Sequence, residues 1–165
     1  LSHMLAYMRL EANNYRWRFN LVTGEVRESD IDDLNTEFSK TNPLYGGQKS
    51  RYAYHQHIPT HDEGGYTLRF TGLVKYDNET GKSWRFDYGS GVLGSEAVYA
   101  PKVRATRHHE EDDGYVVNFV HDTKDWSSWF CVYDAKGIEH GPIARVRLPG
   151  RVPSGFHATW VPQAL

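Results

Sequence analysis

The chain lacks the features that mark secreted, membrane-spanning or polyanion-binding proteins. It has one cysteine, Cys131, which excludes an internal disulfide, and the apolar run WFCVY around it predicts a small core residue. No apolar stretch approaches the roughly 20 residues of a membrane span, and no signal peptide opens the chain. Its 19 Lys and Arg are scattered among 21 Asp and Glu, so nucleic acid is not an expected partner. We therefore predict a soluble, cytoplasmic protein without a transmembrane segment.

Motifs for serine, cysteine or phosphate chemistry are also missing. There is no nucleophile elbow, P-loop or supported Cys-His pair. GSGVLG at residues 89–94 matches the dinucleotide fingerprint in letters only, because a strand pattern ending in a proline follows where a helix is needed. We interpret these glycines as a loop and expect no nucleotide site.

What the chain does contain is a succession of short aromatic and β-branched runs, separated by Gly, Pro, Asn and Asp. Tyr15, Trp17, Phe19 and Leu21 alternate with polar residues, which is the period of a half-buried strand. Similar runs recur along the chain, and only the first dozen residues have a pattern compatible with a helix. The sequence therefore predicts an all-β fold with antiparallel sheets, in a single region over residues 1–165.

Three hairpin glycines recur at a regular spacing. Gly81 follows Gly24 by 57 residues, and Gly137 follows Gly81 by 56. A period near fifty, with about four strands in each unit, is typical of β-propeller blades. Three incomplete blades are therefore expected, with turns at these glycines. A β-sandwich with coincidental spacing is the alternative.

Each unit also contains a short run that ends in proline: residues 37–43, 96–101 and 157–162. Aligned on the proline, these runs place Glu37, Glu96 and His157 in one structural phase, at the start of the innermost strand of a blade. Ionisable groups gathered at a crowded axis are costly to bury without partners. The pattern therefore indicates a metal site or an ion-pair network, and one buried histidine taken alone would more often be a core residue.

Two other histidine groups are weaker metal candidates. His55 and His57 would present both imidazoles on one face of a strand, with His61 nearby, but no second ligand cluster follows. We interpret YHQHIPTHDE as a solvated loop between strands. His108 and His109 lie in RHHEEDDG, a charge run expected to form a flexible solvent loop.

The sequence resembles the carotenoid cleavage oxygenase family, which includes apocarotenoid and lignostilbene dioxygenases and a retinoid isomerase. The resemblance runs in order over nearly the whole chain, through YRWRFNLVTGEVRES, TEFSKTNP, GSEAVYAPK, DDGYVVNFVHD and ARVRLPGRVPSGFHATWVP. It implies part of a seven-bladed β-propeller, about three C-terminal blades. It also implies a non-haem iron(II), Fe(II), held by four histidines with glutamates behind them.

By that likeness, His157 is the last of the four metal ligands, and Glu37 and Glu96 are two of the supporting glutamates. Phe156 and Trp160 would shield the site. The implied reaction uses O2 to cleave a carbon-carbon double bond of a lipophilic conjugated substrate, giving two carbonyl products. Family members are about three times longer, so an upstream part of the propeller would complete the site and could associate with membranes. This chain alone is expected to be inactive.

Neighbouring blades at one phase imply a specific geometry. Glu96 should lie between Glu37 and His157 and accept a hydrogen bond from Nδ1 of His157, leaving Nε2 toward the axis. Glu37 should be orphaned or solvated within this chain. The competing hypothesis is a catalytically silent propeller or β-sandwich that serves as an interaction module.

Overall fold

The computed structural model describes residues 11–60, 69–103, 109–153, 155 and 157–162. This part of the chain is almost wholly β, as the sequence predicts; the expected helical pattern lies mostly in residues 1–10, outside the described residues. The described residues include two short 3-10 helices, Pro43–Tyr45 (η1) and Ile138–His140 (η3). The strands are Asn13–Phe19 (β1), Val26–Lys40 (β2), Tyr52–His57 (β3), Gly72–Asp77 (β4), Lys82–Asp87 (β5), Val92–Gly94 (β6), Val98–Pro101 (β7), Gly114–Asp122 (β8), Ser128–Asp134 (β9) and Pro142–Arg147 (β10).

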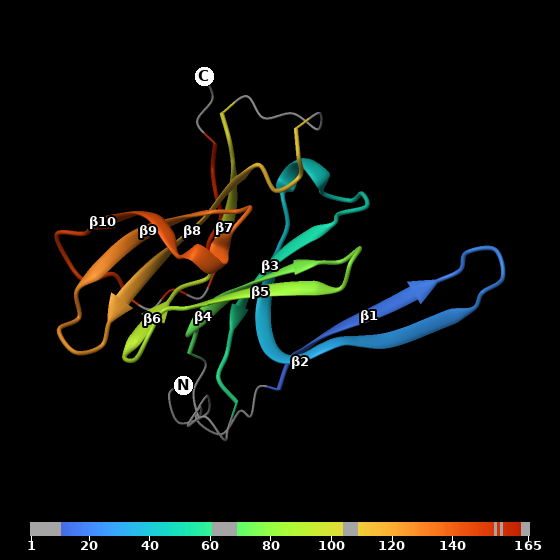
Figure 1. Ribbon diagram of the computed structural model, residues 1–165, viewed down its shortest axis with the longest axis horizontal. Helices are drawn as coiled ribbons and strands as arrows, with labels where there is room; N and C mark the ends of the chain where they lie inside the picture. The colour runs from blue at the N-terminus through green and yellow to red at the C-terminus, as the bar shows by residue number, and fades with distance from the viewer. Residues whose placement is uncertain (1–10, 61–68, 104–108, 154, 156, 163–165) are drawn as a thin grey trace.

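The strands form two antiparallel sheets that lie side by side (Figure 1). The first has the order β1-β2-β3-β4-β5, and the second has the order β10-β9-β8-β6, with β7 also paired to β8. The long strand β2 belongs to two units, because residues 26–30 pair with β1 and its later residues pair with β3. The end of β2 with β3, β4 and β5 thus makes one four-stranded unit, and β7 to β10 make the next.

Two of the three predicted turns are confirmed. Gly24 and Gly81 have φ of +74° and +71°, in the left-handed region that glycine tolerates best, between β1 and β2 and between β4 and β5. The third prediction is wrong in detail, because Gly137 has a φ of −144° and caps η3. The left-handed residue between β9 and β10 is Gly141, since the inserted η3 moves the reversal of the chain four residues on.

The main core fills the space between the two sheets. Tyr54 and Leu73 from the first sheet pack with Val116, Cys131 and Tyr133 from the second, and all five side chains are buried. The predicted core position of Cys131 is confirmed, and burial raises the pKa of its thiol. Because both sheets contribute side chains to one core, they form a single packed body.

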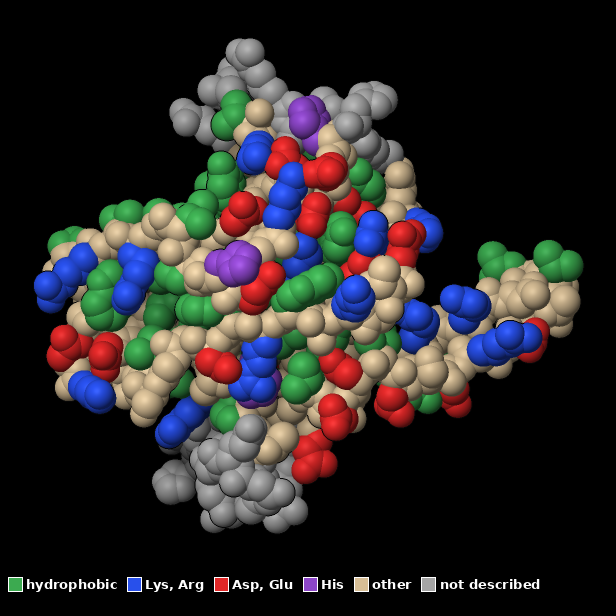
Figure 2. Space-filling view, viewed as in Figure 1, with side chains coloured by type: hydrophobic (Ala, Val, Ile, Leu, Met, Phe, Trp, Pro, Cys, Tyr) green, Lys and Arg blue, Asp and Glu red, His purple; other side chains and the backbone are tan. Residues whose placement is uncertain are grey.

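The β1–β2 hairpin projects away from this body (Figure 1). The predicted alternation of β1 is present, but the expectation of a half-buried strand is wrong, because Trp17 and Phe19 are 57% and 63% exposed. Leu21 and Val22 at the turn are each 95% exposed. Figure 2 shows apolar side chains at the end of this arm, with basic and acidic side chains along it; the basic residues where β1 pairs with β2 are all arginines.

The acidic run before β8 is not the solvent loop that its charge predicts. The Glu111 carboxylate accepts hydrogen bonds from the backbone N–H groups of Arg51 and Tyr52, at 2.8–2.9 Å. Asp112 pairs at 2.7 Å with Lys75, whose side chain is 3% exposed. The run therefore anchors the second sheet to the first. His109 is exposed beside it, and His108 lies outside the described residues.

No helix in the described part of the chain is long and apolar enough to cross a membrane.

Candidate functional site

Glu96 is a buried carboxylate at the inner edge of the second sheet. It lies between β6 and β7 with its side chain only 2% exposed. Lys40, the last residue of β2, places Nζ 2.7 Å from Oε1 of Glu96. The backbone N–H of Ala158 donates to Oε2 of Glu96. A buried carboxylate is stable only when such donors replace the water it has lost, so these two contacts account for its burial.

His157 lies against the same carboxylate. Its Nδ1 is 3.4 Å from Oε2 of Glu96, which confirms the predicted proximity of the two residues. The imidazole is not buried as the sequence analysis assumed, because its side chain is 68% exposed. Residues 157–162 form no strand in this structure, which corrects the expectation of a third inner strand. What holds the run in place is the Ala158 contact with Glu96, one residue beyond His157.

Phe38 supplies the aromatic contact to His157, and the sequence analysis did not select it. The two ring centroids are 4.9 Å apart with the rings edge to face, and Phe70 packs on the other side of Phe38 at 5.2 Å. Phe38 has a φ of +57°, a strained conformation for a bulky side chain. The pairing of β2 with β3 shifts register between Glu37 and Lys40. A bulge changes the direction of nearby side chains. Here it allows Phe38 and Lys40, two residues apart on β2, to contact His157 and Glu96 respectively.

Glu37 lies at the same phase of the preceding unit. It pairs with Gln56 in the register of β2 and β3, and its side chain is half-buried. Its Oε2 accepts a hydrogen bond from the backbone N–H of Phe38 at 3.2 Å. The carboxylate is therefore not orphaned, and the expectation of an orphaned or solvated group is met only in that the side chain is partly exposed. The structure thus places Glu37, Phe38 and Lys40 on one short stretch, from which Phe38 contacts His157 and Lys40 contacts Glu96.

His55 and His57 are buried in β3, so their interpretation as a solvated loop is wrong. They are 6% and 3% exposed, and each Nδ1 meets a threonine hydroxyl: His55 meets Thr36 at 3.2 Å, and His57 meets Thr71 at 2.9 Å. Burial lowers the pKa of His55 to about 4, so this imidazole is neutral at physiological pH. Both residues therefore belong to the packed interior of the first sheet. His61 lies outside the described residues.

A small hollow adjoins the Glu96 contact. It has a volume of about 130 Å³ and is lined by Lys40, Pro43, Val98 and Trp160 among others. Trp160 therefore borders Lys40, whereas the ring in contact with His157 is Phe38. The predicted shielding residue Phe156 lies outside the described residues. Lys40 carried a sequence signal that could have been used, since a cation three residues after Glu37 is a possible partner for the next glutamate in phase.

The arrangement has the chemistry of one part of a metal centre. A carboxylate that accepts from Nδ1 of a histidine fixes the ring orientation and leaves Nε2 to bind a metal ion. Within the described ranges, no group of three or more His, Cys, Asp or Glu side chains is placed to hold a metal by itself. The residues present therefore fit a single ligand with its supporting carboxylate, and they do not make a complete ligand set.

Solved structures with this arrangement of strands are oxygenases. A variant of the apocarotenoid oxygenase of Synechocystis superposes with a TM-score of 0.79 at 20% identity, covering 92% of this chain and 30% of that one. The lignostilbene dioxygenase of Pseudomonas brassicacearum superposes with a TM-score of 0.78 at 27% identity, covering 90% and 32% of the two chains. The class of fold is thus part of an oxygenase β-propeller.

Sequence comparison identifies the family. The family described as retinal pigment epithelial membrane protein matches residues 4–162. The carotenoid 9,10(9',10')-cleavage dioxygenase 1 of Pisum sativum is 39% identical over 164 residues, which cover 89% of this chain and 28% of that protein. The chain belongs to the carotenoid cleavage oxygenase family. It spans less than a third of the length of these relatives.

Proposed function

We propose that this chain is part of a non-haem iron(II) dioxygenase that cleaves a carbon-carbon double bond of a carotenoid, apocarotenoid or stilbenoid. One O2 and one alkene give two carbonyl products, so both oxygen atoms are accounted for. The observation that carries the proposal is the contact between the Glu96 carboxylate and Nδ1 of His157, in a chain of this family. The three substrate classes come from the names of the relatives. Cytoplasmic action is part of the same proposal.

In this proposal, His157 is one iron ligand and binds through Nε2. Glu96 accepts a hydrogen bond from the Nδ1–H group, which holds the imidazole in the tautomer that leaves Nε2 free for the metal and raises its basicity. Lys40 fixes the Glu96 carboxylate from the opposite oxygen, at 2.7 Å, so the carboxylate cannot rotate away from the ring. Phe38 limits the tilt of the imidazole by its edge-to-face contact.

Glu37 has the corresponding role for a histidine supplied by another part of the propeller. Its carboxylate is accessible at the same phase as Glu96, one unit earlier. When bound, the iron supplies an open coordination position at which O2 can react with the alkene. The remaining ligands are proposed to come from the other blades, because the described residues offer only one candidate histidine at this edge. By itself, this chain is proposed to be inactive.

The proposal is tested in the oxygenase that unites this chain with the remaining blades. Glu96→Gln keeps the shape of the side chain but weakens its pairing with Lys40 and His157. We expect iron affinity or cleavage rate to fall about 10–100-fold, the usual effect of losing a partner of a metal ligand. Cleavage of an apocarotenoid or a stilbene is followed by chromatography of the carbonyl products.

The matched control is Glu79→Gln, which removes an exposed carboxylate that pairs with Lys49 on the surface. This variant is expected to retain wild-type cleavage and iron content. If Glu96→Gln behaves like Glu79→Gln in both measurements, Glu96 does not support the iron site and the assignment is wrong.

A further inference from the structure

One face of the projecting β1–β2 hairpin carries three arginines. In the register of the two strands, Arg18 lies directly opposite Arg27, and Arg16 lies directly opposite Ser29. Residues paired in this way share a face, so the three guanidinium groups and the Ser29 hydroxyl are neighbours. Like charges directly opposite each other destabilise a strand pair. The arrangement therefore has an electrostatic cost for the isolated hairpin.

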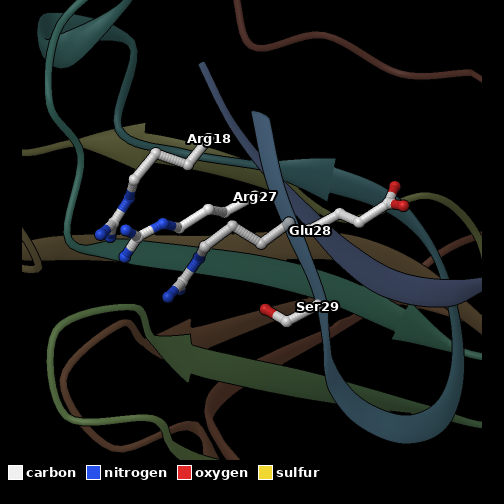
Figure 3. A pocket seen from close by; sticks show the side chains of 5 residues that line it. Arg18, Arg27, Glu28 and Ser29 are labelled. Atoms are coloured by element: carbon white, nitrogen blue, oxygen red, sulfur yellow. The ribbon is translucent and has the colours of Figure 1, made fainter. Parts of the chain in front are cut away.

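Glu28 and Asp30 lie on the other face of the hairpin and do not offset this cost. Glu28 is paired with Trp17 and accepts the indole N–H at 3.1 Å. Figure 3 shows the Glu28 carboxylate pointing away from the side to which Arg18 and Arg27 extend. Glu28 and Asp30 thus share the aromatic face, and the arginines lie on the opposite face with Glu25 as their neighbouring acid.

Little within the described residues neutralises the arginines. Arg27 pairs with Glu25 at 2.8 Å, but both side chains are at least half exposed, and such surface pairs contribute little. Arg16 donates to the backbone carbonyl of Asn78 at 3.3 Å, which is a neutral acceptor. Among the residues that the structure describes, Arg16 and Arg18 form no ion pair. The face therefore has an excess of positive charge.

The arginine face is also hollowed. Arg16, Arg18, Arg27, Glu28 and Ser29 line a hollow of about 310 Å³, into which Figure 3 shows the guanidinium groups of Arg18 and Arg27 extending from two different strands. Guanidinium groups bind phosphate oxygens through paired, charge-assisted hydrogen bonds. The Ser29 hydroxyl adds a further donor at the same face. A doubly charged oxyanion matches this donor set in charge, and the hollow of about 310 Å³ has room for it.

We propose that this face binds a phosphate group, with Arg18 and Arg27 as its principal ligands and Arg16 and Ser29 as supporting donors. The phosphate belongs to a soluble phosphorylated small molecule or to the head group of a phosphatidate-type lipid, since the two present the same chemistry. The site lies on the hairpin and uses none of the residues around Glu96. The phosphate site can therefore be tested independently of the proposed oxygenase function.

The test compares binding of defined probes to the chain and to single variants. Isothermal titration with inorganic phosphate, at an ionic strength held constant with sodium chloride, reports the soluble source. Cosedimentation with phosphatidylcholine vesicles, with and without phosphatidic acid, reports the lipid source. Arg18→Gln and Arg27→Gln are each expected to weaken binding about tenfold or more, since each removes a charge-assisted pair of hydrogen bonds. Arg147→Gln, which removes an exposed arginine of β10, is the control and should bind as wild type.

A second measurement distinguishes loss of the site from loss of the fold. Because Arg18 and Arg27 repel each other, Arg18→Gln should raise the thermal midpoint of the phosphate-free protein or leave it unchanged. Phosphate should raise the midpoint of the wild type and not that of Arg18→Gln. Saturable binding to only one probe, lost in Arg18→Gln, supports the site and identifies its source. The absence of saturable binding to both probes, or binding that survives in Arg18→Gln and Arg27→Gln, overturns the proposal.

Discussion

At the scale of single residues, burial and pairing determine what each ionisable side chain does. The Glu96 carboxylate is buried because Lys40 and the N–H of Ala158 replace the water around it. His55 is buried beside a hydroxyl and an aromatic ring, and desolvation lowers its pKa to about 4. Polar partners thus accompany the burial of Glu96, whereas His55 is buried as a neutral imidazole.

The lowered pKa of His55 predicts a pH-dependent stability. Its ordinary pKa is 6.5, so between pH 6.5 and about 4 the unfolded state binds more protons than the folded state. The contribution of His55 to the free energy of unfolding should therefore be complete above pH 6.5. It should decrease as the pH falls through this window, by about 2 kcal/mol between pH 7 and pH 5. Urea unfolding at the two pH values measures the effect.

A histidine-to-glutamine pair isolates this contribution. His55→Gln should lose most of the pH dependence, whereas His140→Gln, which replaces an 82% exposed imidazole, should retain it. If the free energy of unfolding changes equally with pH in the wild type and in His55→Gln, His55 is not the group that titrates.

At the scale of elements, the turns show how far local sequence determines structure. Gly24 and Gly81 have the positive φ that their hairpin sequences predict. Between β9 and β10, the insertion of η3 transfers this requirement from Gly137 to Gly141. A hairpin sequence specifies its turn only when nothing folds between the strands, and no local signal predicted η3.

This difference can be measured with alanine substitutions. Gly141→Ala should lower the free energy of unfolding by about 1–2 kcal/mol, because its φ is +83° and the new Cβ would lie 3.0 Å from the Phe86 ring. Gly137→Ala should cost clearly less, since its φ is negative and the atoms nearest its new Cβ, at 2.9 Å, belong to the exposed His140 side chain, which can move. Urea unfolding of both variants gives the comparison, and a larger loss at position 137 would contradict the structural assignment.

The parts that sequence reasoning missed are those set by long-range pairing. Alternation predicted the strands, and phase predicted that Glu96 and His157 meet, because both depend on regular periods. The bulge at Phe38 breaks that period, so the contact of Phe38 with His157 could not be read from spacing. Glu111 looked like part of a solvated charge run, and only the packing of the two sheets gives it the Arg51 and Tyr52 N–H groups.

At the scale of the whole molecule, the described chain leaves apolar surface and strand edges open. Trp17, Phe19, Leu21 and Val22 on the β1–β2 hairpin are all more than half exposed. Propellers of four to eight blades close on themselves and protect such surfaces, and two sheets with an arm do not. We expect the chain on its own to associate as its concentration rises, which static light scattering measures.

Variants of the hairpin tip distinguish association through its exposed apolar side chains from association caused by general instability. Lysine at both Leu21 and Val22 should reduce the association without changing the circular dichroism spectrum, because these side chains are 95% exposed. A wild-type chain that remains a monodisperse monomer at all concentrations would contradict the interpretation that these open apolar surfaces and strand edges drive association.

The central claim is that His157, held by Glu96, is a ligand of an iron site shared with the rest of the propeller. Metal analysis of the complete oxygenase tests it most directly, with His157→Ala compared with His140→Ala, which removes an exposed imidazole of η3. The account predicts one iron per polypeptide in the wild type and in His140→Ala, and loss of most of the iron in His157→Ala. Full iron content in His157→Ala would contradict it.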